Sequence, residues 1–404
     1  MSLLQAAWKK KFKTTMGDPM GDIGYPTGFL AYDFRNGALS KGLDSNGDEM
    51  EYYSLGIRDG SIASFIGRSG CGKTTFATQA AMSIVLSFKT SEVHYFDAER
   101  GLGEARLYNL LNTVPNSVID KKFVYHSKGI TTEKFYEKVA FIHKTKLENK
   151  EEYLYNTGKF NSKGEPIYKY EPTVVVLDSV AMLLPDNLSE EEELSGSMSA
   201  AHVAKANTAT IKRLIPKCSE TNIILLIVNH ITSAMSTGPF PAKPELSYLK
   251  PGESLPGGKT LSYANSLIVR FDDKTKLKND KTYGIDGVLV EVTNVKTRNN
   301  LVGKPIPMVM EYNTGFRYEL SLLELLKSHN KIKGAGAHLY LGDLDSVKFS
   351  YKSFPRKLME SAELQNIFRE ECLSILKEFV FDMDEYTKED NTFGPHSLLE
   401  GTNY

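Results

Sequence analysis

Short apolar runs alternate with helix-compatible segments through the middle of the chain. The pattern predicts strands at 61–66, 93–96, 123–126, 174–177 and 223–228, and helices at 76–88, 104–111, 131–144 and 199–217. Strands and helices in alternation predict a mostly parallel sheet with helices on both faces. The expected fold class is therefore α/β.

Polar side chains follow several of these apolar runs. They are Lys73, Glu99, Asp178, Asn229 and His230. Because the carboxyl ends of parallel strands meet at one edge of a sheet, we expect these five side chains to gather there. A ligand is expected to bind at that edge.

The pattern changes on both sides of this region. The glycine-rich, acidic stretch 36–52 predicts a surface loop. The stretch 146–171 predicts a peripheral insert whose hairpin pairs 153–155 with 167–170. Later positions predict antiparallel strands at 288–296 and 307–312, helices from 321 onward with a strong one within 354–379, and an acidic tail at 382–404.

Three parts are expected along the chain. They are a helix or arm at 1–30 that contacts a neighbouring subunit, a core at 31–320 that carries the insert, and a small helical region at 321–404. The arm contains an amphipathic segment, 3–12, for which a membrane-surface anchor is the alternative.

The strand at 61–66 runs directly into the motif G-x-x-x-x-G-K-T. The segment comprises Gly67, Arg68, Ser69, Gly70, Cys71, Gly72, Lys73, Thr74 and Thr75. Such glycines let backbone N–H groups surround a phosphate at a helix start, the lysine neutralises the outer phosphates, and the threonine hydroxyl completes a Mg²⁺ shell. A chance glycine-rich turn is the alternative, but the flanking strand and helix favour a nucleoside-triphosphate site.

Two carboxylates follow neighbouring predicted strands. Asp178 ends the run Val-Val-Val-Leu-Asp and is expected to reach the metal, although any buried strand can end in aspartate. Glu99 follows the strand after the phosphate loop and is expected to orient or deprotonate the attacking water. A solvated turn acid is the alternative for Glu99, and spacing alone leaves both interpretations open.

A long stretch rich in Gly, Pro, Ser and Thr follows His230. It runs over 231–259 and closes on Pro256-Gly257-Gly258-Lys259. A structureless loop of this length inside a compact domain is uncommon unless it is functional or disordered. We expect a loop whose order changes with nucleotide state, with a dispensable insertion as the alternative.

Composition limits the classes of function. The 404 residues are 41% hydrophobic and 25% charged, as in an ordinary soluble globular protein of two or three domains. A net charge of −1 gives no global basic field, so contact with nucleic acid needs local patches. Cys71, Cys218 and Cys372 lack metal-ligand spacing and predict reduced thiols. No apolar stretch predicts a membrane span or a signal peptide, so a cytoplasmic location without a membrane partner is expected.

Taken in order, these motifs resemble the RecA recombinase family. They are the phosphate loop, Asp97-Ala98-Glu99, Val-Val-Val-Leu-Asp-Ser, the pair Asn229-His230, and a long loop that closes on Gly257-Gly258. The resemblance covers 24–326 and is closest to the phage branch typified by UvsX, which also has Asn-His where bacterial RecA has Asn-Gln. It implies a RecA-like P-loop NTPase core that uses ATP and Mg²⁺.

The resemblance also implies roles for single residues. Lys73 and Thr74 correspond to the phosphate and Mg²⁺ residues, Glu99 to the water-activating glutamate, Asp178 to the metal-shell aspartate, and His230 to the γ-phosphate sensor. Lys296 and Arg298 fall where the family has two cations that reach the γ-phosphate of the next subunit. An exposed strand with alternating charges is the alternative for this pair.

Two segments resemble the DNA-binding loops of the family. The first is 188–198, with Lys205 and Lys212 at basic positions of the next helix, and the second is 231–259, with Gly257, Gly258 and Lys259 at its end. Lysines seven positions apart lie on one helical face, which suits contacts with successive phosphates. A solvated lysine stripe is the alternative for Lys205.

The chain departs from the family pattern at several places. Arg106 stands where the family commonly has a tyrosine that stacks on adenine, and it is our candidate at the nucleotide base. The first DNA loop is acidic, the second is long and rich in proline, and the insert has no counterpart in bacterial RecA.

The expected function is that of an ATP-dependent recombinase that forms helical filaments on single-stranded DNA and exchanges strands with double-stranded DNA. A mediator and a single-strand-binding protein are the further expected partners. One alternative is a hexameric replicative helicase, which needs a large N-terminal partner domain, whereas about 60 residues precede the phosphate loop. A mediator paralogue with weak ATPase activity is the other.

Overall fold

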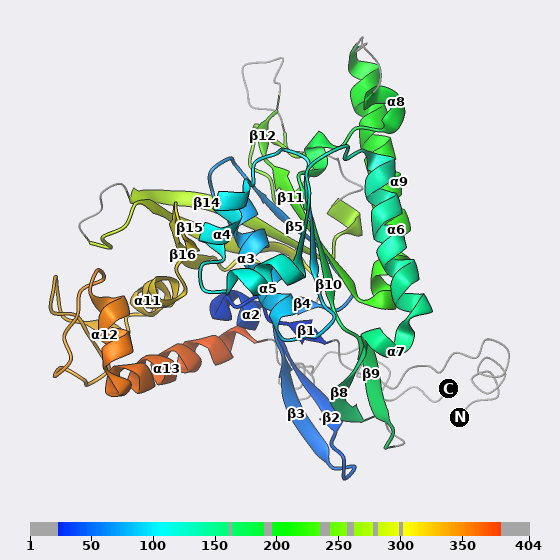
Figure 1. The fold of residues 1–404 in the computed structure, drawn as a ribbon. Coiled ribbons are helices and arrows are strands. Elements are labelled where there is room, and N and C mark those ends of the chain that lie inside the picture. Colours follow the sequence, from blue (N-terminus) through cyan, green and yellow to red (C-terminus); the bar gives the residue numbers. More distant parts are fainter. Residues whose placement is uncertain are drawn as a thin grey trace, which may run out of the picture.

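The computed structural model describes residues 23–160, 164–189, 196–234, 243–256, 262–277, 282–298 and 302–380. Its centre is a nine-stranded sheet with the order β17-β16-β15-β14-β5-β11-β10-β6-β7 (Figure 1). The parallel strands are β5 (Ile62–Gly67), β6 (Val93–Asp97), β7 (Phe123–His126), β10 (Thr173–Asp178), β11 (Ile223–His230) and β14 (Leu267–Leu277). Three antiparallel strands extend it, β15 (Gly287–Thr297), β16 (Ile306–Glu311) and β17 (Gly315–Phe316). The predicted mostly parallel α/β fold is confirmed.

Helices cover both faces of the sheet, as predicted. One face carries α3 (Lys73–Leu86), α4 (Glu104–Leu110), α5 (Asn116–Lys122) and α11 (Tyr318–Ser328), and the other α6 (Thr132–Glu148) and α9 (Gly196–Thr221). Strand β10 shows the cause, because Val174 and Val176 join one hydrophobic cluster while Val175 and Leu177 join the other. A strand buried on both faces reads as a continuous apolar run.

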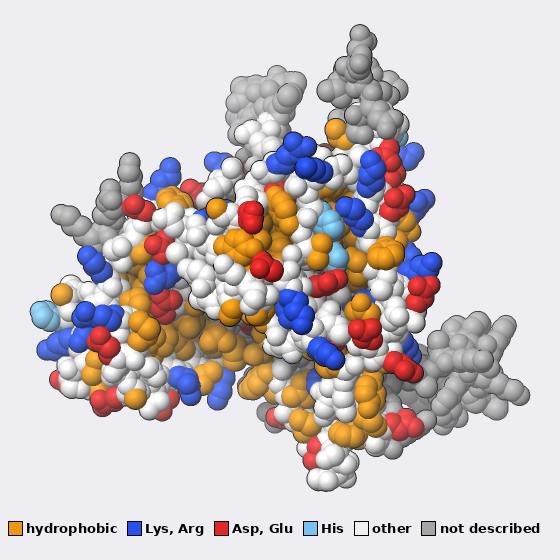
Figure 2. All heavy atoms as spheres, in the orientation of Figure 1, with side chains coloured by type: hydrophobic (Ala, Val, Ile, Leu, Met, Phe, Trp, Pro, Cys, Tyr) orange, Lys and Arg blue, Asp and Glu red, His pale blue; other side chains and the backbone are white. Residues whose placement is uncertain are grey.

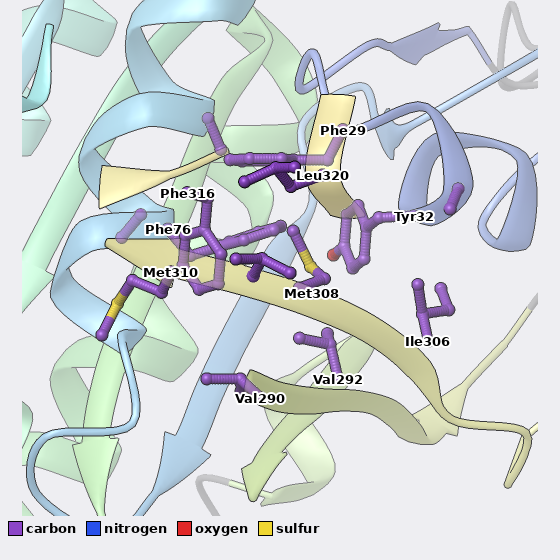
Figure 3. Packing of buried hydrophobic residues seen from close by; sticks show 14 of the residues in the cluster. Phe29, Tyr32, Phe76, Val290, Val292, Ile306, Met308, Met310, Phe316 and Leu320 are labelled. Carbon is purple, nitrogen blue, oxygen red and sulfur yellow. The ribbon is translucent and has the colours of Figure 1, made fainter. Parts of the chain in front are cut away.

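An aromatic cluster fixes helix α3 against the sheet (Figure 3). Phe76 of α3 stacks on Phe29 with ring centroids 4.5 Å apart and meets Phe316 of β17 edge-on at 6.0 Å. Tyr32, on α2 (Leu30–Arg35), meets Phe76 at 4.9 Å. Because α3 begins at the phosphate loop, this packing also holds the loop in place.

The stretch 36–52 corrects one prediction. Instead of a surface loop it contains β2 (Ala38–Leu43) and the first residues of β3 (Glu49–Ser54), which pair as a hairpin. The polar content that suggested a loop has two sources. Residues of β3 alternate between exposed and half-buried, and the turn is closed by Asp44, whose carboxylate accepts hydrogen bonds from the backbone N–H of Asn46 and Asp48.

The hairpin predicted inside the insert is confirmed. Strands β8 (Leu154–Phe160) and β9 (Pro166–Tyr170) pair in antiparallel register, with Leu154 opposite Tyr170. Together with β2 and β3 they form a four-stranded sheet that projects from the lower end of the core (Figure 1). Helix α6 continues through Glu148 and α7 (Lys150–Tyr153) follows, so Lys146 belongs to the core and not to the insert.

Short elements complete the described chain. They are β1 (Gly24–Tyr25) with β4 (Ile57–Arg58), β12 (Thr232–Ser233) with β13 (Glu253–Ser254), β18 (Ile332–Lys333) with β19 (Tyr340–Leu341), α8 (Asp186–Ser189), and 3-10 turns at Val180–Met182 and Lys377–Phe379. The helix predicted within 354–379 is divided into α12 (Phe354–Glu360) and α13 (Ala362–Leu376), because the Ser361 hydroxyl caps a new helix by accepting the Leu364 N–H at 3.1 Å.

Two predicted segments lie outside the described residues: most of the arm, 1–22, and the acidic tail from 381 onward. Across the part of the chain that the structure describes, no helix has the length and apolar character needed to cross a membrane. Acidic and basic side chains are interspersed over the face shown in Figure 2.

Candidate functional site

The phosphate loop joins β5 to α3 and depends on glycine for its shape. Gly70 and Gly72 adopt left-handed backbone conformations, with φ of 81° and 88°. A Cβ on Gly72 would lie 2.6 Å from the Met310 sulfur and 2.8 Å from the Phe316 ring. Gly72 is therefore required by both conformation and space.

Lys73 lies beneath this loop with its ammonium group enclosed. Its side chain is buried, and Nζ donates to the Arg68 carbonyl at 2.7 Å and lies 3.7 Å from the Cys71 sulfur. Burial lowers the pKa of Lys73, while Cys71 and Asp178 act in the opposite direction. A desolvated cation held by one carbonyl is suited to take up an anion.

Thr74 and Asp178 meet as the motifs predicted. The Thr74 hydroxyl donates to Asp178 Oδ2 at 2.6 Å, and the Tyr95 hydroxyl donates to the same oxygen at 2.7 Å. The other oxygen, Asp178 Oδ1, is buried without a hydrogen-bond partner among the described residues. Burial raises the pKa of Asp178, and the bonds from Thr74 and Tyr95 oppose that rise.

This pair fits a hard divalent cation. Mg²⁺ prefers oxygen ligands and is commonly held by one or two protein oxygens together with substrate phosphates and water. A partnerless carboxylate oxygen beside a threonine hydroxyl supplies such ligands. Among the described residues, no group of three or more His, Cys, Asp or Glu side chains is placed to hold a metal ion by itself.

Glu99 and His230 lie together at the same sheet edge. His230 Nε2 is 3.0 Å from one Glu99 oxygen and 3.2 Å from the other, and the Ser179 hydroxyl donates to Oε1 of Glu99. The strand register explains the meeting, because His230 pairs with Gly67 and the Ala98 and Glu99 N–H groups both donate to the Asp178 carbonyl. The five polar residues predicted to gather do lie at this edge.

Arg106 lies on α4 and contacts a turn. Its guanidinium donates to the backbone carbonyls of Tyr312 and Asn313, the latter at 2.9 Å, in the turn between β16 and β17. Arg106 therefore links α4 to the turn between two strands of the central sheet.

Lys296 and Arg298 lie at the opposite end of the sheet. Lys296 pairs with Ile268, which pairs with Ser64, three residues before Gly67 and so about 10 Å behind the phosphate loop. Lys296 Nζ donates to the Ser262 carbonyl at 2.6 Å, and Arg298 donates to the Tyr263 carbonyl at 3.4 Å. The structure does not bring this pair to the chain's own phosphate loop.

The candidate DNA residues are only partly described. Lys205 and Lys212 are both exposed on α9, and their contact with DNA stays a prediction. Gly257, Gly258 and Lys259, and positions 190–195 of the first loop, lie outside the described residues.

The described part of the second loop, 231–259, contains defined structure. Its stem is the β12–β13 pair, and Arg270 of β14 holds Glu253 of β13 through two bonds of 2.8 and 2.9 Å. Arg270 also donates to the Tyr248 carbonyl, and Asn229 donates to the Pro256 carbonyl at 2.7 Å. The sequence did not indicate these contacts, because a buried ion pair distant in sequence gives no local pattern. A change of order with nucleotide state stays a prediction.

Two residues of the site carried no assigned role in the sequence reasoning. Ser179 is fully buried and bonded to Glu99, and Tyr95 is buried and bonded to Asp178. Tyr95 lies two positions before Asp97 on β6. Alternation along the strand therefore predicts that both side chains lie on the same face of the sheet.

A search against protein-family models gave no match. The plasmid RecA protein of Lactococcus lactis subsp. lactis is 25% identical to this chain over 284 residues, which are 70% of this chain and 68% of that protein. This similarity supports a relationship to the RecA family, and the mixed α/β sheet fits a core of that kind. The phage branch remains a prediction.

Proposed function

We propose that the protein is an ATP-dependent homologous recombination protein that forms helical filaments on single-stranded DNA and catalyses pairing and strand exchange. The single observation that carries the proposal is the sheet edge at which Lys73, Thr74, Asp178, Glu99 and His230 meet. The similarity to a plasmid RecA protein supports a role in recombination for a nucleotide site at that edge.

Each residue has a role in ATP hydrolysis. Backbone N–H groups of the phosphate loop and Lys73 bind the phosphates. Thr74 and Asp178 would hold Mg²⁺, which when bound neutralises charge on the phosphate oxygens. Glu99 orients and deprotonates the attacking water, and His230 contacts the terminal phosphate.

Lys296 and Arg298 complete the site of a neighbouring copy. They lie about 10 Å behind their own phosphate loop along the strands, so their reach favours another chain. Cations supplied by a second subunit stabilise transition-state charge only after assembly. Hydrolysis would therefore depend on self-association, which matches a filament.

DNA contacts would involve Lys205, Lys212 and the end of the second loop. Exposed lysines on one helical face suit backbone phosphates, so binding should tolerate any sequence and weaken with salt. Base pairing would then test homology.

A ring-forming helicase and a mediator with weak ATPase activity are the competing functions. The presence of Glu99, Asp178 and His230 in one cluster argues against a mediator that does not hydrolyse ATP. Electron microscopy with ATP and single-stranded DNA separates the others, since filaments support the recombinase and closed hexamers support the helicase.

A double substitution tests the shared site. Lys296→Ala with Arg298→Ala should reduce DNA-stimulated ATP hydrolysis about a thousandfold while nucleotide binding by the isolated chain is retained. Equal loss of binding and hydrolysis would contradict a role at the neighbour's phosphate.

A further inference from the structure

The Glu99 carboxylate is held from two sides by other residues of the chain. Ser179 donates its hydroxyl to Oε1, and His230 Nε2 lies 3.0 Å from Oε1 and 3.2 Å from Oε2. Ser179 is fully buried, whereas the side chains of Glu99 and His230 are 30% and 27% exposed. Ser179 is therefore shielded from solvent, whereas Glu99 and His230 remain accessible to a ligand.

The contact between His230 and Glu99 depends on the hydrogen that Nε2 of His230 carries. A carboxylate only accepts hydrogen bonds, so Nε2 of His230 carries the hydrogen in this contact. In a neutral ring the second nitrogen, Nδ1, then has no hydrogen to donate. For a neutral ring, a bond to a terminal phosphate would need the same N–H, so neutral His230 can serve Glu99 or the phosphate but not both.

The backbone around the contact is fixed. The Glu99 N–H donates to the Asp178 carbonyl at 3.1 Å, and the His230 N–H donates to Asn229 Oδ1 at 2.9 Å. A change of partner therefore needs only rotation of side chains. Such a step is fast compared with rearrangement of strands.

We propose that Ser179 and His230 form a latch on Glu99 that a nucleoside triphosphate opens. The terminal phosphate accepts the His230 N–H, and Glu99 loses that donor as the water to be activated arrives. A diphosphate lacks the terminal group and leaves the latch closed. The proposal rests on the proposed nucleotide site and adds a regulatory step to it, because the sensor and the general base share one hydrogen.

Binding measurements test the latch without hydrolysis. Glu99→Gln and Glu99→Ala remove the same charge, but glutamine keeps an acceptor for His230 and alanine does not. Since only the triphosphate must open the latch, Glu99→Ala should bind a non-hydrolysable ATP analogue about threefold to tenfold more tightly than Glu99→Gln. Both variants should bind ADP equally.

Three outcomes of that titration have distinct meanings. Tighter binding of the triphosphate analogue alone supports the latch. Equal affinities of the two variants for the analogue overturn the latch and leave the nucleotide site standing. Failure of the wild-type chain to bind either nucleotide overturns both proposals.

A kinetic test uses Ser179→Ala, which removes one oxygen from the latch. ATP hydrolysis without DNA should rise about threefold or more, because Glu99 is held less firmly. Ser91→Ala is the matched control, since Ser91 is a buried serine that lies two residues before the start of β6 and should leave the rate unchanged. Equal falls in hydrolysis with and without DNA would show that Ser179 only positions Glu99, and would overturn the latch.

Discussion

Two regions of this protein bury polar groups in contrasting ways. At the carboxyl edge, formed by the phosphate loop with Glu99, Asp178 and His230, a buried carboxylate oxygen lacks a hydrogen-bond partner among the described residues. At the insert joint, formed by Tyr25, Lys146, Tyr170, Glu171 and Asn222, the buried polar groups are paired within the chain.

The insert joint shows how complete that pairing is. Lys146 Nζ donates to the Glu171 carbonyl at 2.7 Å and to the Thr173 hydroxyl at 3.1 Å. Asn222 donates to the Tyr25 hydroxyl and the Tyr170 carbonyl, both at 2.7 Å, and accepts the Gly60 N–H. Satisfied buried groups stabilise a structure, whereas partly satisfied ones are ready for a ligand.

The largest expected effect is on nucleotide chemistry. Lys73→Ala should reduce ATP hydrolysis about a thousandfold, because the cation that faces the phosphates is lost. The free energy of unfolding should change by less than about 1 kcal/mol, since Lys73 is poorly paired within the chain. Hydrolysis assays and urea unfolding of the same preparation test the contrast, and a loss of stability comparable to the loss of rate would contradict it.

The next effect is a pH dependence at the insert joint. Burial lowers the pKa of Lys146 to about 7. Between about pH 7 and pH 10 the unfolded chain therefore binds more protons at this residue than the folded chain, and the free energy of unfolding should rise with pH. The rise from this one group is at most about 1.4 kcal/mol per pH unit.

Lys146→Met should abolish that rise. Urea unfolding at intervals from pH 7 to pH 10 measures it, with Lys144→Met as the control because Lys144 is largely exposed on the same helix. An unchanged slope in Lys146→Met would show that the proton is not taken up at this side chain.

A smaller effect is expected from Asn222. The residue has a left-handed backbone, with φ of 52°, and joins three segments through its side chain. Asn222→Ala should lower the free energy of unfolding by about 3 kcal/mol, and Asn222→Gly by about 2 kcal/mol, because glycine avoids the backbone strain. ATP hydrolysis should persist in both variants. A loss of hydrolysis without a fall in the free energy of unfolding would contradict the contrast between the insert joint and the carboxyl edge.

The smallest effect is expected on the outer strands of the four-stranded sheet. Tyr168 is 54% exposed on β9, and Tyr168→Ala should change the free energy of unfolding by less than about 0.5 kcal/mol. Thermal unfolding measures this change, and a loss above about 2 kcal/mol would show that the sheet is packed more tightly than its exposure indicates.

The two regions also differ in how far the sequence predicted them. Strands such as β10 and β11 are apolar along their length because both faces are buried, so the pattern located them to within one or two residues. Strand β14 was missed as a unit, since its second half carries four charged residues that are partly or fully exposed, Asp272, Asp273, Lys274 and Lys276. The sequence of a half-buried strand with several charged residues resembles the sequence of a loop.

Motif spacing predicted which polar residues lie together at the sheet edge but not their contacts. The pairing of Thr74 with Asp178 follows from a known arrangement, whereas the Ser179 bond to Glu99 depends on side-chain geometry that spacing does not encode. The joint of Lys146 and Asn222 was not predicted either, because its partners are backbone carbonyls and hydroxyls without a sequence signature.

The separation of Lys296 from its own phosphate loop has a consequence for how rows of associated chains grow. On the proposed function every chain has a loop at one end of the sheet and two cations at the other, so copies associate head to tail. A row of such chains contains one complete site fewer than its number of members. Hydrolysis per chain should then rise as short rows lengthen and level off in long ones, and the two ends of a row should differ in their rates of subunit addition.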